Sequence, residues 1–566
     1  MRLLVSALAL LLIAGCSTTH LNTTNATQAP ANLEARYFQV KIPTRDGKEL
    51  AATVYQPAMS AGEDAPLIIA THGWGGFRAK RPFSLYGKSM LTGEAALAAW
   101  KKGYWVVFYD QRGWGDSDGH VHMMDPDYEV ADLSQVIDWS LNHLPGIHRL
   151  DDGSPAIGMI GESYGAGVQT LAAFNEKRLK AIVPLASWYD MNSVAPNGEF
   201  RTGWGGILLA AGAINSGFDV GEMFAEPWRS AFGGTVNEQL KALMYQRSPA
   251  WYCDQGKRPY ADALFIQGFH DTMFPYQQAE KNQQCWEKGG RDARLIGLQS
   301  AHVLPWPIQQ WEGFLPFETD DNVHCGDFND TTVDTVVSWW DEKLRGGKSE
   351  LPNTCINVDD ERGIALNAPL PEGRDEFPVP KSRVTLPLSG AFEWLMIGFD
   401  VGTDMFRGLW PGADLRDLKP NGGFGRPKFV PVYVARGDDE LLLGKPRIDL
   451  NLGGTSGKKS MPVFVGVGVQ HANHRRVKVA SEQLTPLPDK GIYRMELPAL
   501  SQPLEAGDRV GLIIYGFTTQ FPLNSAFLAR VADVQGHVWL PLSRSDNVAL
   551  KDSLPYPRER SSATME

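Results

Sequence analysis

The segment Gly161-Glu162-Ser163-Tyr164-Gly165 is the feature that most constrains how this chain folds. It follows an apolar run at 156–160, typical of a strand, and precedes residues 166–173, which are typical of a helix. In so tight a strand–turn–helix connection, a side chain at either glycine would clash with the neighbouring strand and helix. Ser163 therefore projects at the tip of the turn. The following backbone N–H and the helix N-terminus point toward any negative charge that develops there.

Strand and helix signals alternate from residue 37 to about residue 347, which predicts a doubly wound parallel sheet of the α/β class. The apolar strand runs indicate that helices cover both faces of the sheet. The expected strands are 66–71, 105–109, 157–160, 181–185, 263–267 and 294–298. Between Trp188 and Tyr252 apolar helical pieces occur without strands. We interpret this segment as a helical cap over the carboxyl edge of the sheet; the alternative is an excursion that packs elsewhere.

Two further residues follow predicted strands and complete a catalytic set with Ser163. A serine hydroxyl is a weak nucleophile until a histidine removes its proton, and that histidine needs a carboxylate to fix its tautomer. Asp271 and His302 both follow strands, so they are expected at the sheet edge that carries Ser163. We interpret Asp271 as the orienting acid and His302 as the general base; the alternatives are a turn aspartate and a surface histidine. His270 is expected to point elsewhere.

The loop His72-Gly73-Trp74-Gly75-Gly76 follows an early strand and resembles the oxyanion loops of lipases and esterases. An oxyanion needs two donors close to the nucleophile. We expect the backbone N–H groups of Trp74 and Tyr164 to supply them, and we expect His72 to brace the loop.

Longer motifs resemble one enzyme family. Residues 110–119 are similar to the D-x-R-G-x-x-x-S-x-G stretch of the Xaa-Pro dipeptidyl-peptidase and cocaine-esterase family, and residues 339–346 resemble its W-x-D-x-x-L-x-G helix. The resemblance covers most of the mature chain and is weaker in the C-terminal half. It implies an α/β-hydrolase with a helical cap, a jelly-roll-like domain and the triad Ser163, Asp271 and His302.

One position departs from that family pattern. Many members carry a Pro-Tyr pair in the early loop, with the tyrosine hydroxyl as oxyanion donor, whereas Gly73-Trp74 stands there in this chain. An indole cannot supply the same hydroxyl, so a backbone donor is expected. The family's particular substrates therefore do not transfer directly.

The C-terminal part has a different periodicity. At 566 residues the chain is too long for one core. Beyond Thr354, apolar residues recur at every second position, which predicts strands with one buried face and hence a β-sandwich. Residues 385–425 are aromatic and fit neither domain; we interpret them first as core packing, with a cleft wall or a membrane-touching loop as alternatives. The expected organisation is a signal peptide at 1–15, a tether at 16–35, a catalytic domain at 36–350 with its cap at about 188–252, a β-sandwich at 351–550 and a tail at 551–566.

The N-terminus is typical of a targeting segment. Arg2 precedes an apolar stretch at 3–13 that is too short to span a bilayer. Ile13-Ala14-Gly15-Cys16 resembles a bacterial lipobox, which implies cleavage before Cys16, acylation of that residue and a membrane anchor. The alternative is a plain secretory signal with an incidental cysteine. Ser17, rather than an aspartate, favours the outer membrane if the source is Gram-negative.

The remaining cysteines fit an exported protein. Cys253, Cys285, Cys325 and Cys355 permit two disulfides with three alternative pairings. None has metal-ligand spacing with a histidine, so no metal is expected. The net charge of −11, without long runs of one sign, argues against nucleic-acid binding.

These features predict a serine hydrolase that cleaves an ester or amide bond of a small molecule or peptide through an acyl-enzyme, without a cofactor. A true Xaa-Pro dipeptidyl-peptidase is the first alternative. It would need an anion in the cap for the free amine of its substrate; Glu199, Asp219, Glu222 and Glu226 are candidates there. A non-catalytic surface lipoprotein that binds a ligand through its β domain is the second alternative.

Overall fold

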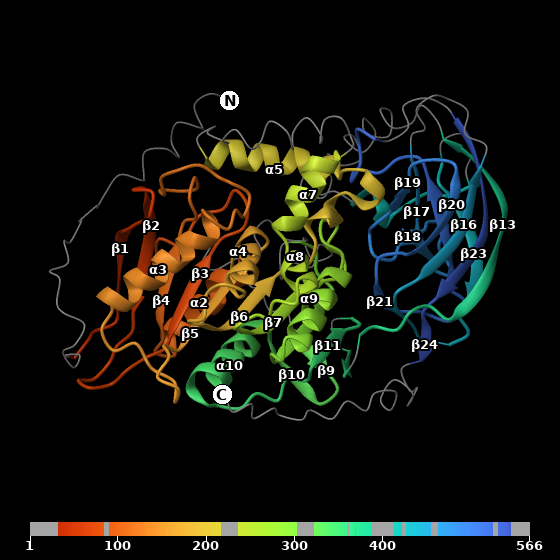
Figure 1. The fold of residues 1–566 in the computed structure, drawn as a ribbon. Helices are drawn as coiled ribbons and strands as arrows, with labels where there is room; N and C mark the ends of the chain where they lie inside the picture. Colours follow the sequence, from red (N-terminus) through yellow and green to blue (C-terminus); the bar gives the residue numbers. More distant parts are fainter. Residues whose placement is uncertain are drawn as a thin grey trace, which may run out of the picture.

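The computed structural model places a helix-covered sheet beside a stack of antiparallel sheets (Figure 1). The predicted signal peptide, Cys16, Asp219, Glu222, Glu226 and most of residues 385–425 lie outside the described residues. Within the described part of the chain, no helix is long and apolar enough to cross a membrane. The structure describes residues 32–83, 90–216, 236–302, 322–359, 362–367, 369–386, 413–421, 426–437, 439–453, 462–524 and 530–544.

The larger sheet has ten strands in the order β1-β2-β4-β3-β5-β6-β7-β8-β11-β12. Strands β3 to β8 and β11 run parallel to one another, whereas β1, β2 and β12 join antiparallel at the edges. The bounds are β1 Arg36–Pro43, β2 Glu49–Gln56, β3 Leu67–Thr71, β4 Trp105–Tyr109, β5 Ile157–Glu162, β6 Leu179–Leu185, β7 Asp262–Gly268, β8 Ala293–Leu298, β11 Thr354–Asn357 and β12 Gly363–Leu366.

Helices cover both faces of this sheet, as the apolar strand runs predicted. Residues of α2 and α10 join one buried cluster, and residues of α3, α4 and α9 join another. Every residue of β3, β4, β5 and β8 is buried, because each strand is covered on both sides. The doubly wound α/β fold is therefore confirmed. The helices are α2 Leu91–Lys101, α3 Glu129–His143, α4 Tyr164–Ala172, α9 Gln277–Lys288 and α10 Thr332–Arg345.

The sheet continues beyond residue 350, where the domain boundary was predicted. Strand β11 pairs in parallel with β8, and β12 turns back against β11, so the sheet ends at Leu366. The boundary near residue 350 is too early because these two short strands lack the long apolar runs that mark the central strands. A small hairpin, β9 Asn322–Cys325 and β10 Phe328–Thr331, precedes α10.

Two disulfides resolve the three alternative pairings: Cys253 bonds Cys285, and Cys325 bonds Cys355. The first joins helix α8 (Pro249–Asp254) to α9, and the second joins β9 to β11. Each closes a short stretch of chain, with sequence separations of 32 and 30 residues.

The described residues between β6 and β7 form helices and no strand. Helix α5 runs along the upper edge of the molecule in Figure 1 and contacts the loop after β3, where the Trp74 indole donates a 2.8 Å hydrogen bond to the Leu208 carbonyl. This segment has the composition and place that were expected of a cap. Its other elements are η1 Met191–Val194, η2 Pro196–Gly198, α5 Thr202–Asn215, α7 Glu238–Gln246 and α8.

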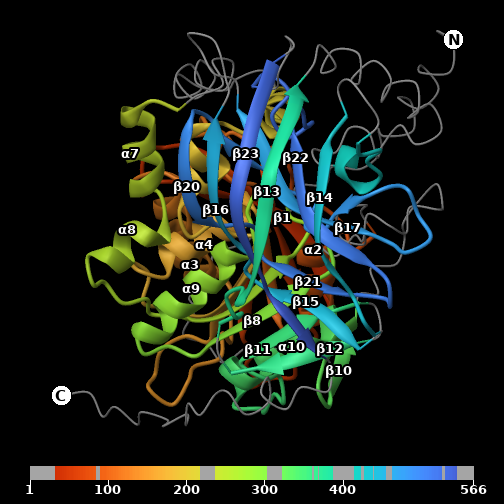
Figure 2. The same cartoon turned by 90° about the vertical axis from the view of Figure 1, so that its right-hand side faces the viewer.

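The C-terminal strands form a β-sandwich, which Figure 2 shows in front of the larger sheet. One sheet has the order β13-β23-β16-β20, and the other pairs β14, β22, β17, β18 and β19. Residues of both sheets share one buried cluster, and β16 alternates buried and less buried side chains. The bounds are β13 Asp375–Leu386, β14 Lys428–Val434, β16 Arg447–Gly453, β17 Val463–Gln470, β18 Lys478–Val479, β19 Thr485–Leu487, β20 Gly491–Glu496, β22 Arg509–Tyr515 and β23 Arg530–Leu540; a third sheet holds β15 Glu440–Gly444, β21 Leu500–Pro503 and β24 Leu542–Arg544.

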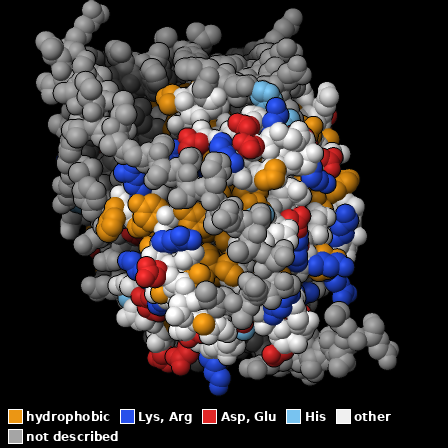
Figure 3. All heavy atoms as spheres, turned by 90° about the vertical axis from the view of Figure 1, so that its left-hand side faces the viewer, with side chains coloured by type: hydrophobic (Ala, Val, Ile, Leu, Met, Phe, Trp, Pro, Cys, Tyr) orange, Lys and Arg blue, Asp and Glu red, His pale blue; other side chains and the backbone are white. Residues whose placement is uncertain are grey.

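The face that Figure 3 presents carries acidic and basic side chains interspersed among its described atoms. A surface that attracts a polyanion needs many cations gathered together. This face has no such single-sign patch among its described residues.

Candidate active site

Ser163 lies in the turn between β5 and α4, with the strained backbone that this connection requires. Its φ is +50° and its ψ is −108°, which is unusual for a residue with a side chain. A Cβ on Gly161 would lie 2.7 Å from the Gly165 carbonyl oxygen, and one on Gly165 would lie 2.9 Å from the Thr71 carbonyl oxygen. Both glycines are therefore sterically necessary, which explains the sequence of the turn.

The structure brings together the three residues predicted from the strand ends. The Ser163 hydroxyl lies 2.9 Å from His302 Nε2, and His302 Nδ1 lies 2.8 Å from Asp271 Oδ2. Asp271 is completely buried and His302 nearly so. An Nδ1–H that donates to the carboxylate leaves Nε2 as the acceptor for the serine proton.

The Asp271 carboxylate is held by three further donors. Its Oδ1 accepts from the backbone N–H groups of Met273 and Phe274 at 2.8 and 2.9 Å. Its Oδ2 accepts from the Gln267 side chain at 2.8 Å. These bonds satisfy a buried carboxylate and keep it in line with His302.

Aromatic side chains enclose the imidazole of His302. The rings of Trp204 and Phe274 lie 5.1 and 5.4 Å from it, both edge to face. The Trp204 indole also donates to Thr272 Oγ1 at 3.0 Å. Since Trp204 belongs to α5, the cap shields the base from water, which strengthens the electrostatic interactions of the triad.

The loop after β3 lies directly against the serine turn. His72 is completely buried; its Nδ1 lies 2.7 Å from the Gly73 carbonyl, and the backbone N–H of Gln111 donates to its Nε2 at 3.2 Å. Burial lowers the pKa of His72, so the ring is neutral. His72 thus braces the loop.

Trp74 and Tyr164 use their side chains elsewhere, so each can offer only its backbone N–H to an oxyanion. The Trp74 indole bonds to the cap, and its ring packs edge to face on Tyr164 at 5.3 Å. The Tyr164 hydroxyl accepts from the Met124 N–H at 3.2 Å and donates to Glu129 Oε1 at 3.1 Å. The N–H of Tyr164 opens α4, where an α-helix provides no carbonyl partner.

Glu162 is a residue of the site that the sequence did not single out for a role. Its Oε1 accepts from the Gly73 N–H at 2.8 Å, and its Oε2 accepts a hydrogen bond from the Thr92 hydroxyl. The carboxyl thereby links the serine turn to the oxyanion loop. Burial raises the pKa of Glu162 to about 8, although the bond from Gly73 opposes that shift. In the sequence, an acidic residue at the end of an otherwise apolar strand is the signal that could have indicated this role.

His270 points away from Ser163, as expected. Its Nε2 lies 3.2 Å from Gln299 Oε1 and its Nδ1 lies 3.4 Å from Glu482, a residue of the sandwich part. Burial lowers its pKa to about 4, although the Glu482 charge opposes this. Glu199 of the cap also faces the sandwich, where its carboxylate accepts from the Asn524 side chain.

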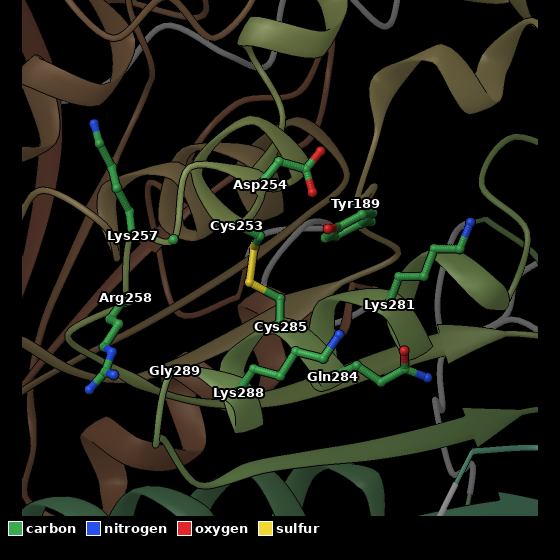
Figure 4. Close-up of a pocket in the computed structure, with 11 residues that line it drawn as sticks. Tyr189, Cys253, Asp254, Lys257, Arg258, Lys281, Gln284, Cys285, Lys288 and Gly289 are labelled. Atoms are coloured by element: carbon green, nitrogen blue, oxygen red, sulfur yellow. A yellow bond between two sulfur atoms is a disulfide. The ribbon is translucent and has the colours of Figure 1, made fainter.

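A cavity of about 490 Å³ lies beside the Cys253–Cys285 disulfide and not at the triad (Figure 4). No residue of the triad or of the oxyanion loop lines it. Its four cationic side chains extend in different directions in Figure 4, so they do not converge on one anion. They are Lys257, Arg258, Lys281 and Lys288.

The fold and the Ser–His–Asp geometry define an α/β-hydrolase. Residues 46–304, which contain the whole triad, match the X-Pro dipeptidyl-peptidase (S15 family). This part of the chain is therefore similar to the Xaa-Pro dipeptidyl-peptidase/cocaine-esterase-like hydrolases, in agreement with the motif at residues 110–119.

Three solved structures share the fold at low sequence identity. An alpha-amino acid ester hydrolase is 14% identical with a TM-score of 0.59, covering 93% of this chain and 98% of that one. An aminopeptidase from a marine sediment Thaumarchaeota archaeon is 14% identical with a TM-score of 0.60, covering 94% and 99%. A CocE/NonD family hydrolase from Staphylococcus aureus is 12% identical with a TM-score of 0.55, covering 93% and 99%.

The curated relatives are matched over part of their length. An uncharacterized Pseudomonas aeruginosa protein is 26% identical over 211 residues, which is 34% of this chain and 52% of that protein. This chain thus spans about half the length of that relative.

Proposed function

We propose that this protein is a serine hydrolase that cleaves an ester or amide bond through an acyl-enzyme. The observation that carries the proposal is the continuous hydrogen-bonded line from Asp271 through His302 to Ser163, with distances of 2.8 and 2.9 Å. A nucleophile, a base and an orienting acid within hydrogen-bond reach are the requirement for this chemistry.

The residues act in two half-reactions. Ser163 Oγ attacks the substrate carbonyl carbon while His302 Nε2 takes the hydroxyl proton, and the N–H groups of Tyr164 and Trp74 stabilise the oxyanion. The bond to the leaving group then breaks, and that group takes the proton from His302. A water molecule attacks the acyl-enzyme, again with His302 as base, and releases the acid and free Ser163.

Labelling with a fluorophosphonate probe tests this proposal. We expect one covalent adduct per chain, on Ser163, and none in Ser163→Ala. That variant should lose turnover by about four orders of magnitude or more, since removal of a triad member leaves only binding and oxyanion stabilisation. A folded wild-type protein that stays unlabelled would support the alternative of a non-catalytic surface protein that binds a ligand.

We propose a broader ester or amide substrate range rather than strict Xaa-Pro dipeptide release. A dipeptidyl-peptidase needs an anion for the substrate's free amine. Of the four acidic residues that were predicted candidates, the structure describes Glu199, and its carboxylate is bonded to Asn524. Hydrolysis of p-nitrophenyl esters and of Xaa-Pro amides should be compared side by side. A kcat/KM for Xaa-Pro amides far above that for all esters would favour the dipeptidyl-peptidase instead.

We also propose export and lipid anchoring at Cys16. The apolar stretch at 3–13 and the lipobox-like Ile13-Ala14-Gly15-Cys16 support this. Metabolic labelling with a fatty acid should mark the wild-type protein and not Cys16→Ala. Equal labelling of both would exclude Cys16 as the acylated residue.

A further inference from the structure

Two turns at one end of the β-sandwich bring metal-ligating side chains together. His471 follows β17, while Glu505 and Asp508 belong to the turn before β22. One ligand atom from each of these side chains lies within 4.8 Å of the others. The cysteine spacing had indicated no metal, but these three ligands come from two segments far apart in the sequence and include no cysteine.

The carboxylates of Asp508 and Glu505 have one basic side chain close to them among the described residues, that of His471. Asp508 is completely buried, and its carboxylate contacts His471 Nδ1 at 3.1 and 3.2 Å and the Glu505 N–H at 3.1 Å. Across the described residues, no lysine or arginine forms an ion pair with Asp508 or Glu505. A buried carboxylate beside a second acid is costly unless a positive charge joins them.

The nearby arginines are engaged elsewhere. The guanidinium of Arg509, which follows Asp508 directly, donates to the Gln470 side chain at 3.2 Å. Arg476 pairs with Asp417. Neither of these guanidinium groups therefore compensates the charge of the Asp508 and Glu505 carboxylates.

Backbone hydrogen bonds hold both turns in place. The N–H of His474 donates to the His471 carbonyl at 2.9 Å, and the N–H of Asp508 donates to the Glu505 carbonyl at 3.0 Å. Ala435 bonds to both Gly507 and Asp508 through its backbone, at 2.9 and 2.8 Å. The three ligand side chains thus project from fixed positions, which lowers the entropic cost of binding an ion.

We propose that His471, Glu505 and Asp508 bind a divalent transition-metal ion of the zinc class. One imidazole nitrogen and two carboxylate oxygens are ligands that zinc accepts, and three protein ligands leave a fourth position for water. Calcium prefers six to eight oxygen ligands, so this set suits it poorly. The ring of His474, in the same turn, lies 5.8 Å from that of His471.

Titration calorimetry of the chelator-treated full chain with zinc chloride tests the site. We expect saturable binding of one ion per chain. His471→Ala and Glu505→Gln change exposed residues, and each should weaken binding about tenfold or more. His537→Ala is the matched control, because His537 is also an exposed sandwich histidine, 3.8 Å from the carboxylate of Glu376; it should bind zinc as the wild type does.

A measurement on the wild type alone keeps the test independent of the variants' folding. Crystals soaked in zinc should show an anomalous peak at the zinc edge between His471 and Asp508. No saturable binding, undiminished binding in the His471→Ala/Glu505→Gln double variant, or a peak elsewhere would each overturn the proposal. Ester hydrolysis should not change in His471→Ala, since the site shares no residue with the triad.

Discussion

Glu162 shows how one buried side chain can position two parts of an active site. It precedes Ser163 in sequence, yet its carboxyl contacts Gly73 and Thr92, which lie far back along the chain. With a pKa of about 8 it is mostly protonated at neutral pH, and an uncharged acid suits a buried strand end. Its contact with Gly73 sets the distance between the oxyanion loop and the serine turn.

The raised pKa of Glu162 predicts a pH-dependent cost to stability. In the unfolded chain the acid ionises near 4.5, whereas in the folded protein it stays protonated until about 8. Between these values the unfolded state binds fewer protons than the folded state, so stability falls as pH rises from about 4.5 to 8. Glu162→Gln keeps an acceptor for Gly73 but cannot ionise, and it should remove a loss of the order of a few kcal/mol.

Urea unfolding of Glu162→Gln and the wild type from pH 5 to pH 8 measures this difference. The free energy of unfolding of Glu162→Gln should increase steadily relative to that of the wild type as pH rises. The kcat of Glu162→Gln should fall less than that of Glu162→Ala, which removes the acceptor for Gly73. Parallel stability curves for wild type and Glu162→Gln would contradict the assigned protonation state.

At the scale of elements, the disulfides differ in what they hold. Cys325 lies at the end of β9, the first described element after His302, and its partner Cys355 lies in β11 beside β8, the strand that leads to His302. The Cys325–Cys355 bond therefore fastens the chain that follows His302 to the strand that pairs with β8. The Cys253–Cys285 bond joins α8 and α9 and touches no residue of the triad.

Removing each disulfide should thus cost similar stability but different activity. Their loops have nearly equal lengths, with separations of 30 and 32 residues, so each serine double variant should lose about 3–4 kcal/mol of unfolding free energy. Only Cys325→Ser/Cys355→Ser should also lower kcat when kcat is measured at a temperature well below that of the unfolding transition. Equal effects on kcat from the two double variants would contradict this role in positioning His302.

The sequence predicts the elements and the triad because both depend on local patterns. Strands β5, β7 and β8 are apolar runs, and parallel strands bring their carboxyl ends to one edge, so Ser163, Asp271 and His302 could be expected there. The role of Glu162, the disulfide pairing and the short strand β11 depend on contacts between distant segments. Such contacts leave no periodic signal, which is why β11 was not predicted and the catalytic domain was expected to end near residue 350.

At the scale of the whole molecule, the sandwich supports the cap beside the triad. The Gln520 carbonyl accepts from the Gly203 N–H at 3.0 Å, and its side chain accepts from the Arg201 guanidinium at 2.8 Å. Trp204, which directly follows Gly203, packs on His302. Arg201 is almost fully buried, and this desolvation lowers its pKa to about 10. The sandwich therefore supports the part of the cap that packs on His302.

Gln520→Ala should therefore reduce activity as well as stability. It leaves a buried guanidinium short of an acceptor, which costs about 1–3 kcal/mol, and it loosens Arg201, the residue that precedes α5, while the backbone bond to Gly203 remains. Asn197→Ala is the matched control: it removes a 2.7 Å bond from the cap to the Pro486 carbonyl of the sandwich but does not adjoin Trp204. In a steady-state ester assay, kcat should be lower in Gln520→Ala than in Asn197→Ala. A loss of kcat in Asn197→Ala but not in Gln520→Ala would contradict the view that the sandwich acts on the active site through Trp204.

Intact-protein mass spectrometry tests whether Ser163 forms a covalent acyl intermediate with His302 as base. An activated ester, mixed with the protein and quenched in acid within the first turnover, should add one acyl group per chain, mapped by peptide digestion to Ser163. His302→Ala should abolish the adduct under the same conditions. An adduct on another residue, or turnover of the ester with no adduct at any time point, would contradict the account.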